Sequence, residues 1–237
     1  MLFTKAKKLC SNNNHYQFNV IILMNTFFKT TPHLPYLFIL ALFTLVLSGC
    51  STLANKESKQ LIQQTPEQRI SSLQQLQHWQ IIGKIGYIEK KTRNSATLNW
   101  QVNEKNKTQQ LNLTTYLGIN VLQLDSNKNI HKIQVDGKTY QGKKLEALIY
   151  SITGLTLPTQ ALTFWLKGIP YQESDNISYQ KITRLPQTLT SYYNNELWQV
   201  SYAHYQQIDD YSLATKFSIR KDDLLIKIAV NKWLINH

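Results

Sequence analysis

The residue best placed to carry chemistry is Cys50, because it follows an apolar run and the small residues Ser48 and Gly49. The apolar run from Leu37 to Leu47 is 11 residues long, which is too short to span a bilayer but suits the central region of a signal peptide. Small residues at positions 48 and 49 fit a signal-peptidase site, and the thiol that follows can accept acyl chains. The pattern therefore predicts a bacterial lipoprotein signal with Cys50 as the lipidated residue.

An ordinary buried apolar helix with a chance cysteine is the alternative explanation. The polar sequence that begins directly after Cys50 argues against it. A signal of 49 residues is long, and Met24 offers a second start that is followed by Lys29 as a short basic region. We therefore interpret residues 1–49 as a signal peptide, with residues 1–23 as a mis-assigned or dispensable extension, and exclude them from fold prediction.

The mature chain is predicted to consist of a tether and one domain. Residues 50–64 comprise the lipidated cysteine and a polar, flexible tether, and residues 65–237 are long enough for a single domain with a sizeable core. The two cysteines are Cys10, which lies in the signal, and Cys50, which is acylated. The mature domain therefore has no disulfide, and its stability must come from its core.

The charge of the chain is strongly positive, with 26 Lys and Arg against 14 Asp and Glu and a net charge of +12. Four basic residues and no acidic ones precede Cys50, so the mature chain keeps 22 basic and 14 acidic residues and a net charge of +8. This balance invites a nucleic-acid hypothesis, but an exported lipoprotein rarely meets nucleic acid. Attraction to an anionic membrane or to an acidic partner explains it better. A solvated lysine-rich surface explains it about as well.

Alternation of apolar with polar residues predicts short strands from Trp79 to the end of the chain. The apolar positions of the predicted strands are Ile81, Ile85, Tyr87, Ala96, Leu98, Trp100, Val102, Leu111, Leu113, Leu122, Leu124, Ile133, Val135, Tyr140, Trp198, Val200, Tyr202, Phe217, Ile219, Leu224, Ile226, Ile228 and Val230, with Trp233 close to the end. Strands at this spacing, joined by turns, indicate an antiparallel meander with one apolar face.

Three short helices are predicted beside these strands. Thr65 caps the first, in which Pro66 occupies the first position and Gln68 completes a capping box. The second and third are set by apolar spacing and by the glycines that end them. The apolar positions of the three helices are Ile70, Leu73 and Leu76; Leu145, Leu148, Ile149 and Ile152 before Gly154; and Leu162, Trp165 and Leu166 between Pro158 and Gly168. The fold class is therefore mainly β, a curved antiparallel sheet whose apolar face is covered by a few helices. Such a layer pair either packs solid or encloses a cavity, and the pattern leaves both open.

The ordered motifs of the mature chain resemble the outer-membrane lipoprotein acceptor family LolB of Gram-negative bacteria. Matching segments, besides the signal ending in Cys50, are Trp79–Tyr87 (WQIIGKIGY), Ser95–Trp100 (SATLNW), Leu111–Gly118 (LNLTTYLG), Gly154–Pro158 (GLTLP), Leu162–Pro170 (LTFWLKGIP), Trp198–Tyr202 (WQVSY) and a closing strand that ends in Trp233. The tract from Tyr171 to Asn195 resembles the family only loosely.

The resemblance implies an incomplete antiparallel β-barrel with a helical lid over an apolar cavity. It also implies a function: to accept acylated lipoproteins from the periplasmic carrier LolA and to insert them into the outer membrane, on its periplasmic side. The clients are acylated lipoproteins, the other partner is the outer-membrane lipid, and nucleic acid is not a partner. A monomer without a cofactor is expected, apart from the diacylglycerol and N-acyl chains on Cys50.

In this family an exposed leucine between two central strands promotes delivery into the membrane, and the matching position here is Leu117. It lies between Tyr116 and Gly118 in a predicted turn, where an apolar side chain has little to pack against. Tyr116 suits a membrane interface, although the family commonly has proline at that position. A leucine folded back into the core is the alternative.

The predicted cavity lining combines apolar residues of the strands with apolar residues of the lid. The candidates are Ile85, Leu98, Trp100, Leu113, Leu122, Trp198 and Ile226 from strands, and Leu148, Ile152, Leu162 and Trp165 from the lid. Ordinary core packing explains any one of these residues at least as well.

Two other functions are alternatives to this one. An enzyme is disfavoured, because the histidines are widely spaced without a metal motif and the pairs Asp209-Asp210 and Asp222-Asp223 have the character of turns. A non-catalytic envelope-assembly lipoprotein that binds proteins would share the signal, the basic surface and the β-rich pattern. It would differ in having a solid core and no affinity for acyl chains.

Overall fold

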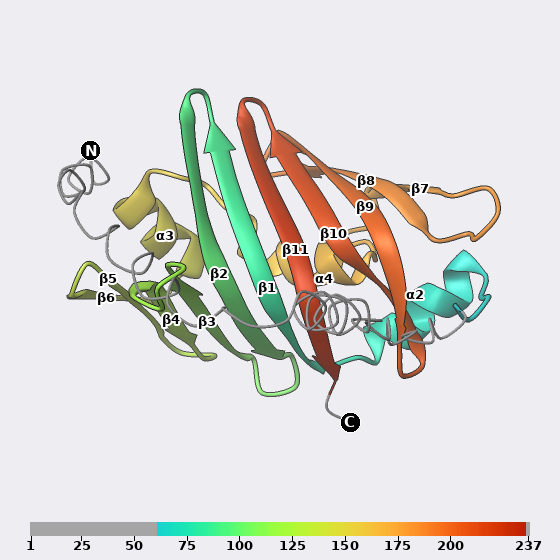
Figure 1. The fold of residues 1–237 in the computed structure, drawn as a ribbon, viewed down its shortest axis with the longest axis horizontal. Helices are drawn as coiled ribbons and strands as arrows, with labels where there is room; N and C mark the ends of the chain where they lie inside the picture. The colour runs from blue at the N-terminus through green and yellow to red at the C-terminus, as the bar shows by residue number, and fades with distance from the viewer. Residues whose placement is uncertain (1–60, 236–237) are drawn as a thin grey trace, which may run out of the picture. The chain divides into compact units, whose positions relative to one another are not determined.

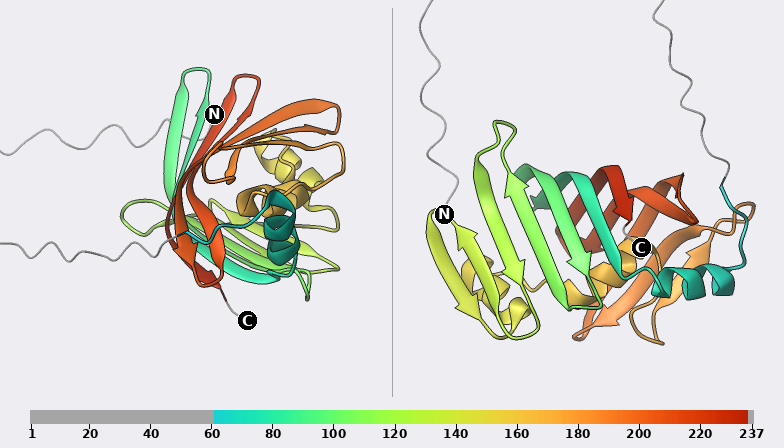
Figure 2. Two further views of the ribbon diagram at one scale, coloured as in Figure 1. Left: turned by 90° about the vertical axis from the view of Figure 1, so that its right-hand side faces the viewer. Right: turned by 90° about the horizontal axis from the view of Figure 1, so that it is seen from below.

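The computed structural model describes residues 61–235, and it shows a large antiparallel sheet curled around helices (Figure 1, Figure 2). The helices are α2 (Pro66–Gln74), α3 (Leu145–Thr153) and α4 (Thr159–Lys167). The strands are β1 (His78–Glu89), β2 (Thr92–Asn103), β3 (Thr108–Thr114), β4 (Asn120–Ser126), β5 (His131–Val135), β6 (Lys138–Gly142), β7 (Asn176–Tyr179), β8 (Pro186–Tyr193), β9 (Glu196–Ile208), β10 (Tyr211–Lys221) and β11 (Leu224–Ile235).

The sheet consists of two meanders joined by the first and last strands. Its order is β6-β5-β4-β3-β2-β1-β11-β10-β9-β8-β7, and every neighbouring pair is antiparallel. Strands β6 and β7 are the two edges, so the sheet is not closed into a barrel. This confirms the predicted fold class, a strongly curved antiparallel sheet with helices on its inner face (Figure 2).

The antiparallel pairing places the turns at two opposite ends of the sheet. We call one the tip end; it carries the turns at residues 90–91, 115–119 and 136–137. The other is the base end, which carries the turns at residues 104–107 and 127–130.

Each predicted strand is present, and two further strands were not predicted. The tract from Tyr171 to Asn195, in which the sequence indicated no strand, contains β7 and β8. Their inner positions include Pro186 and Ser191, both buried, so the apolar alternation that identifies the other strands is absent. The tract between α4 and β7 is held by Asp175, whose carboxylate accepts hydrogen bonds from the Tyr171 amide (2.8 Å) and the Trp165 indole (3.3 Å).

The helix boundaries follow the capping chemistry of the sequence. Thr65 and Gln68 form the capping box at the start of α2, with Pro66 at its first position. Gly154 and Gly168 end α3 and α4 with φ of 72° and 71°, in the left-handed conformation that glycine adopts at low cost. Leu76, predicted to lie on the stripe of α2, is buried but lies beyond the end of the helix.

Two buried cations fix helix α4, one donated by α2 and one by α4 itself. Arg69 of α2 is only 3% exposed and donates to the backbone oxygens of Lys167 (2.8 Å) and Gly168 (2.9 Å), which end α4. Lys167 in turn donates to the Leu76 oxygen (3.3 Å) and forms an ion pair of 2.8 Å with Glu104 in the β2–β3 turn. Because helix ends leave carbonyl groups without partners, Arg69 supplies the donors that α4 itself lacks.

The junction of β1 and β11 depends on Gly83. The register shifts there, because Ile82 pairs with Lys232 and Gly83 with Val230, which leaves Asn231 as an extra residue in β11. A Cβ atom on Gly83 would collide with the backbone oxygen of Ala229, so only glycine fits this close approach. The bulge also keeps Val230 and Trp233 both in the core, although they are three residues apart.

Replacement of Gly83 by alanine should therefore destabilise the fold. We expect Gly83→Ala to lower the free energy of unfolding by about 1–3 kcal/mol, the usual cost of overpacking, measured by urea denaturation. Gly86→Ala in the same strand is the matched control, because a Cβ there would have no neighbour closer than 3.9 Å. Equal stabilities for the two variants would contradict the assigned role of Gly83.

Candidate functional site

The turn between β3 and β4 is held in shape by Thr115. Its backbone oxygen accepts the Gly118 amide (3.0 Å), its amide donates to the Ile119 oxygen (2.8 Å), and its Oγ1 accepts the Ile119 amide (3.2 Å). Gly118 has a φ of 80° and open space around its Cα, as a tight turn requires. These bonds use the backbone and the threonine hydroxyl, so the side chains between them do not contribute to holding the turn.

The side chains of this turn form an exposed apolar surface. Tyr116 is 95% exposed, Leu117 is 81% exposed and Ile119 is 63% exposed. We call these three residues the apolar tip. Large apolar side chains gathered on one turn are typical of contact sites for proteins or membranes. Ile119 was not predicted, although an apolar residue directly after a turn glycine is a signal that could have identified it.

The predicted cavity residues lie in two apolar clusters inside the curved sheet. The larger, under α2 and α4, includes Ile85, Leu98, Trp100, Leu113, Leu162, Trp165, Trp198 and Ile226. The smaller, between α3 and the strands β3 to β5, includes Leu122, Leu148 and Ile152. Leu111 packs against both clusters, so the eleven residues line one continuous interior.

These eleven residues differ in how far they are shielded. Leu98, Trp100, Leu148, Trp165, Trp198 and Ile226 are buried, as members of a packed core are. The other five are only half-buried: Ile85, Leu113, Leu122, Ile152 and Leu162. The second group is where apolar surface inside the sheet remains accessible.

On the β1–β6 half of the sheet, the shielding of the interior decreases toward the tip end, whereas Trp198, Ile219 and Leu224 near that end of β9 to β11 are buried. On β1, Trp79 and Ile81 near the base end are buried, whereas Ile85 and Tyr87 nearer the tip end are half-buried. On β4, Leu124 is buried, and Leu122, which is nearer the tip end, is half-buried. The apolar tip and the accessible apolar interior of β1 to β4 therefore lie toward the same end of the sheet.

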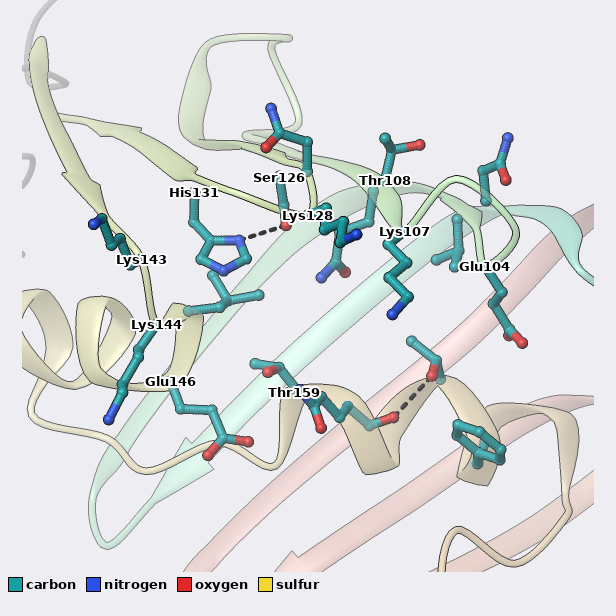
Figure 3. Close-up of a pocket in the computed structure, with 18 of the residues that line it drawn as sticks. Glu104, Lys107, Thr108, Ser126, Lys128, His131, Lys143, Lys144, Glu146 and Thr159 are labelled. Carbon is teal, nitrogen blue, oxygen red and sulfur yellow. Dashed lines mark hydrogen bonds between the residues drawn. The ribbon is translucent and has the colours of Figure 1, made fainter.

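The base end carries a polar pocket of about 1080 Å³ (Figure 3). Its walls come from the β2–β3 and β4–β5 turns and from the first turns of α3 and α4. Ser126 and His131 face each other across β4 and β5, with 2.6 Å between Oγ and Nδ1, and burial lowers the pKa of the His131 imidazole. None of the eleven cavity candidates lines this pocket. The pocket was not predicted from the sequence, although lysines in successive turns were a signal for it.

The residues considered for catalysis lie apart from one another. Asp209-Asp210 and Asp222-Asp223 form the β9–β10 and β10–β11 turns, which confirms their prediction as turns. His204 is an exposed residue of β9 with a φ of 56°. Across residues 61–235 no group of three or more His, Cys, Asp or Glu side chains is arranged to hold a metal ion.

Two sequence predictions concern membrane attachment. Cys50, the signal and most of the tether lie outside the described residues. Among the helices of residues 61–235, none combines the length and the apolar character needed to cross a membrane.

Comparison with known proteins identifies the family of the chain. The family model described as "Outer membrane lipoprotein LolB" matches residues 77–233, from just before β1 to Trp233 near the end of β11. The outer-membrane lipoprotein LolB of Aeromonas hydrophila is 32% identical over 202 residues, which cover 83% of this chain and 97% of that protein. That of Pseudoalteromonas translucida is 31% identical over 199 residues, which cover 84% of this chain and 94% of that protein.

Among solved structures, a LolA superfamily protein from Nitrosomonas europaea superposes with a TM-score of 0.47 at 7% sequence identity. The superposition covers 73% of this chain and 94% of that one. The family match spans more than half of the chain and includes the β3–β4 turn and all eleven cavity candidates. The chain belongs to the outer-membrane lipoprotein LolB family.

Proposed function

We propose that this protein accepts acylated lipoproteins from the periplasmic carrier LolA and inserts them into the outer membrane. Family membership supports an outer-membrane location and a role in lipoprotein localisation. One structural observation carries the finer proposal: the apolar tip and the half-buried strand residues Ile85, Leu113 and Leu122 lie toward the same end of the sheet. Acyl chains held inside the sheet would thus leave it close to the surface that contacts the membrane.

The half-buried interior residues supply the binding surface for acyl chains. Each methylene removed from water contributes about 0.8 kcal/mol, so several free acyl chains cost on the order of tens of kcal/mol in water. Ile85, Leu113 and Leu122 on the sheet and Ile152 on α3 offer apolar surface that the protein itself leaves partly uncovered. Transfer without a nucleotide must run toward tighter binding, from the carrier to this protein and then to the bilayer.

The open edges of the sheet give α3 room to adjust. Helix α3 rests on a small cluster with Leu124, Ile133, Leu145 and Leu148 at its centre, whereas α4 is held by Arg69 and Lys167. A helix that rests on few buried contacts opens at lower cost than one in the main core. We therefore assign α3 as the part of the lid that moves to admit acyl chains, with α4 as its fixed support.

The apolar tip supplies the membrane contact. Burial of a leucine side chain contributes about 1.5–3 kcal/mol, and an aromatic phenol such as that of Tyr116 suits the bilayer interface. The hydrogen bonds of Thr115 hold the tip without using these side chains, so insertion does not require the turn to unfold. The acyl chains that we assign to Cys50 would keep the protein at the membrane surface.

Transfer from a loaded carrier tests the proposed function. The mature Cys50→Ala protein, which lacks the anchor, is mixed with LolA that carries a triacylated lipoprotein, and the location of the lipoprotein is followed by pull-down. We expect the lipoprotein to move to this protein. If it stays on a competent carrier while this protein is shown to be folded, the envelope-assembly alternative with a solid core is favoured.

Replacement of Leu117 separates acceptance from delivery. We expect Leu117→Glu to accept lipoprotein normally but to deliver it into vesicles at least about tenfold more slowly, because a carboxylate opposes insertion. Ile182→Glu is the matched control, since Ile182 is an equally exposed apolar residue (86%) in the connection between β7 and β8. Delivery by Leu117→Glu at the rate of Ile182→Glu would show that the tip has no special role.

A further inference from the structure

The pocket at the base end is lined by lysines from three separate elements. Lys107 lies in the β2–β3 turn, Lys128 in the β4–β5 turn, and Lys143 and Lys144 between β6 and α3. Figure 3 shows Lys107 extending into the space between its turn and α4, with Lys143 and Lys144 on the other side of the pocket. Among the described residues, none of these four lysines takes part in an ion pair.

The two carboxylates of the pocket already have partners. Glu104 forms the ion pair with Lys167 and accepts a hydrogen bond from the Trp79 indole (3.4 Å). Glu146 accepts a hydrogen bond of 2.8 Å from the Tyr193 hydroxyl. The four lysines therefore leave the pocket with an excess of positive charge that favours an anion.

The pocket also has an apolar wall. This wall consists of Val102 of β2, Leu145 of α3, Phe164 of α4 and Tyr171, which follows α4. Phe164 and Tyr171 pack against each other at 5.2 Å between ring centres and in turn adjoin the main core. A ligand of this pocket would thus combine an anionic group with an apolar part.

The positive charge of the pocket is not explained by the lipid of the proposed client. The lipid on an acylated lipoprotein is a neutral thioether-linked diacylglycerol with an amide-linked chain, which gives four lysines nothing to bind. We propose that the base-end pocket binds the phosphate of an anionic glycerophospholipid, with Lys107 and Lys128 on the phosphate and the glycerol and first acyl carbons against the apolar wall.

The shape of the pocket favours a lipid over an acidic protein segment. Flat charged surfaces suit protein partners, whereas this site is a concavity of about 1080 Å³ between two turns and the starts of two helices. Neither α3 nor α4 has a side-chain hydrogen bond at its N-cap, so backbone amides there add to the attraction of the lysines for a phosphate. This inference does not depend on lipoprotein transfer, because it concerns a different ligand at the opposite end of the sheet.

Binding of a soluble short-chain lipid tests the proposal without a membrane. Calorimetric titration of the mature Cys50→Ala protein uses dioctanoyl phosphatidylglycerol below the concentration at which it forms micelles. We expect it to bind more tightly than dioctanoylglycerol, which lacks the phosphate, and than glycerol phosphate, which lacks the chains. Equal binding of glycerol phosphate would reveal a site for free phosphate, and equal binding of dioctanoylglycerol would reveal a site for chains alone; either result overturns the proposal.

Matched lysine variants locate the site. We expect Lys107→Gln combined with Lys128→Gln to weaken phosphatidylglycerol binding by about tenfold or more, because two charge-assisted contacts are lost. Lys90→Gln combined with Lys91→Gln removes the same charge from the tip end and should change the affinity by less than about twofold. Equal effects of the two pairs overturn the proposal. So does lysine-dependent binding of a polyglutamate peptide without binding of phosphatidylglycerol, which would point to an acidic protein partner.

Discussion

The pairing of β1 with β11 is the constraint on which the rest of the structure depends. It joins the meander β1–β6 to the meander β7–β11, and it brings the beginning and the end of the domain to the centre of one sheet. Gly83 permits the close approach, and the bulge at Asn231 turns Trp233 into the core. Trp233 then packs against Trp79, which also packs against Trp100, with ring centres 5.6 and 5.5 Å apart. These aromatic contacts make the core solid near the base end.

On the β1–β6 half of the sheet, the packed base end and the more accessible tip end differ in chemistry. Where the tryptophans and the Arg69 and Lys167 contacts fill the interior, the pocket that remains is lined by lysines and has only a small apolar wall. Where β1 and β4 extend beyond this packing, Ile85 and Leu122 stay half-buried and face the interior near the apolar tip. We therefore propose that one sheet with unpaired edges at β6 and β7 binds acyl chains toward one end and an anion at the other.

The sequence predicted the elements well and the distinction between core and ligand surface poorly. Alternation identifies a strand such as β2 because Leu98, Trp100 and Val102 all face the interior. Strand β8 was not predicted, because Ser191 and Pro186 occupy inner positions where the pattern requires apolar side chains. The burial of Arg69 was not predicted either, since arginine is rarely buried. Its partners are backbone oxygens at the end of α4, which is distant in the sequence. Leu98 and Leu113 are equivalent in the pattern and are direct neighbours across β2 and β3, yet one is buried and the other is not. Their difference arises from curvature and from the helices above them, which no local pattern encodes.

The central claim, that acyl chains occupy the half-buried interior, is tested most directly by photo-crosslinking. A lipoprotein whose acyl chain carries a diazirine is loaded onto the mature Cys50→Ala protein, and the labelled residues are identified by mass spectrometry. The account predicts labels on Leu113, Leu122 and Ile152, which are half-buried and face the interior. Labels confined to exposed apolar residues away from the interior, such as Ile182 and Tyr192, would contradict it.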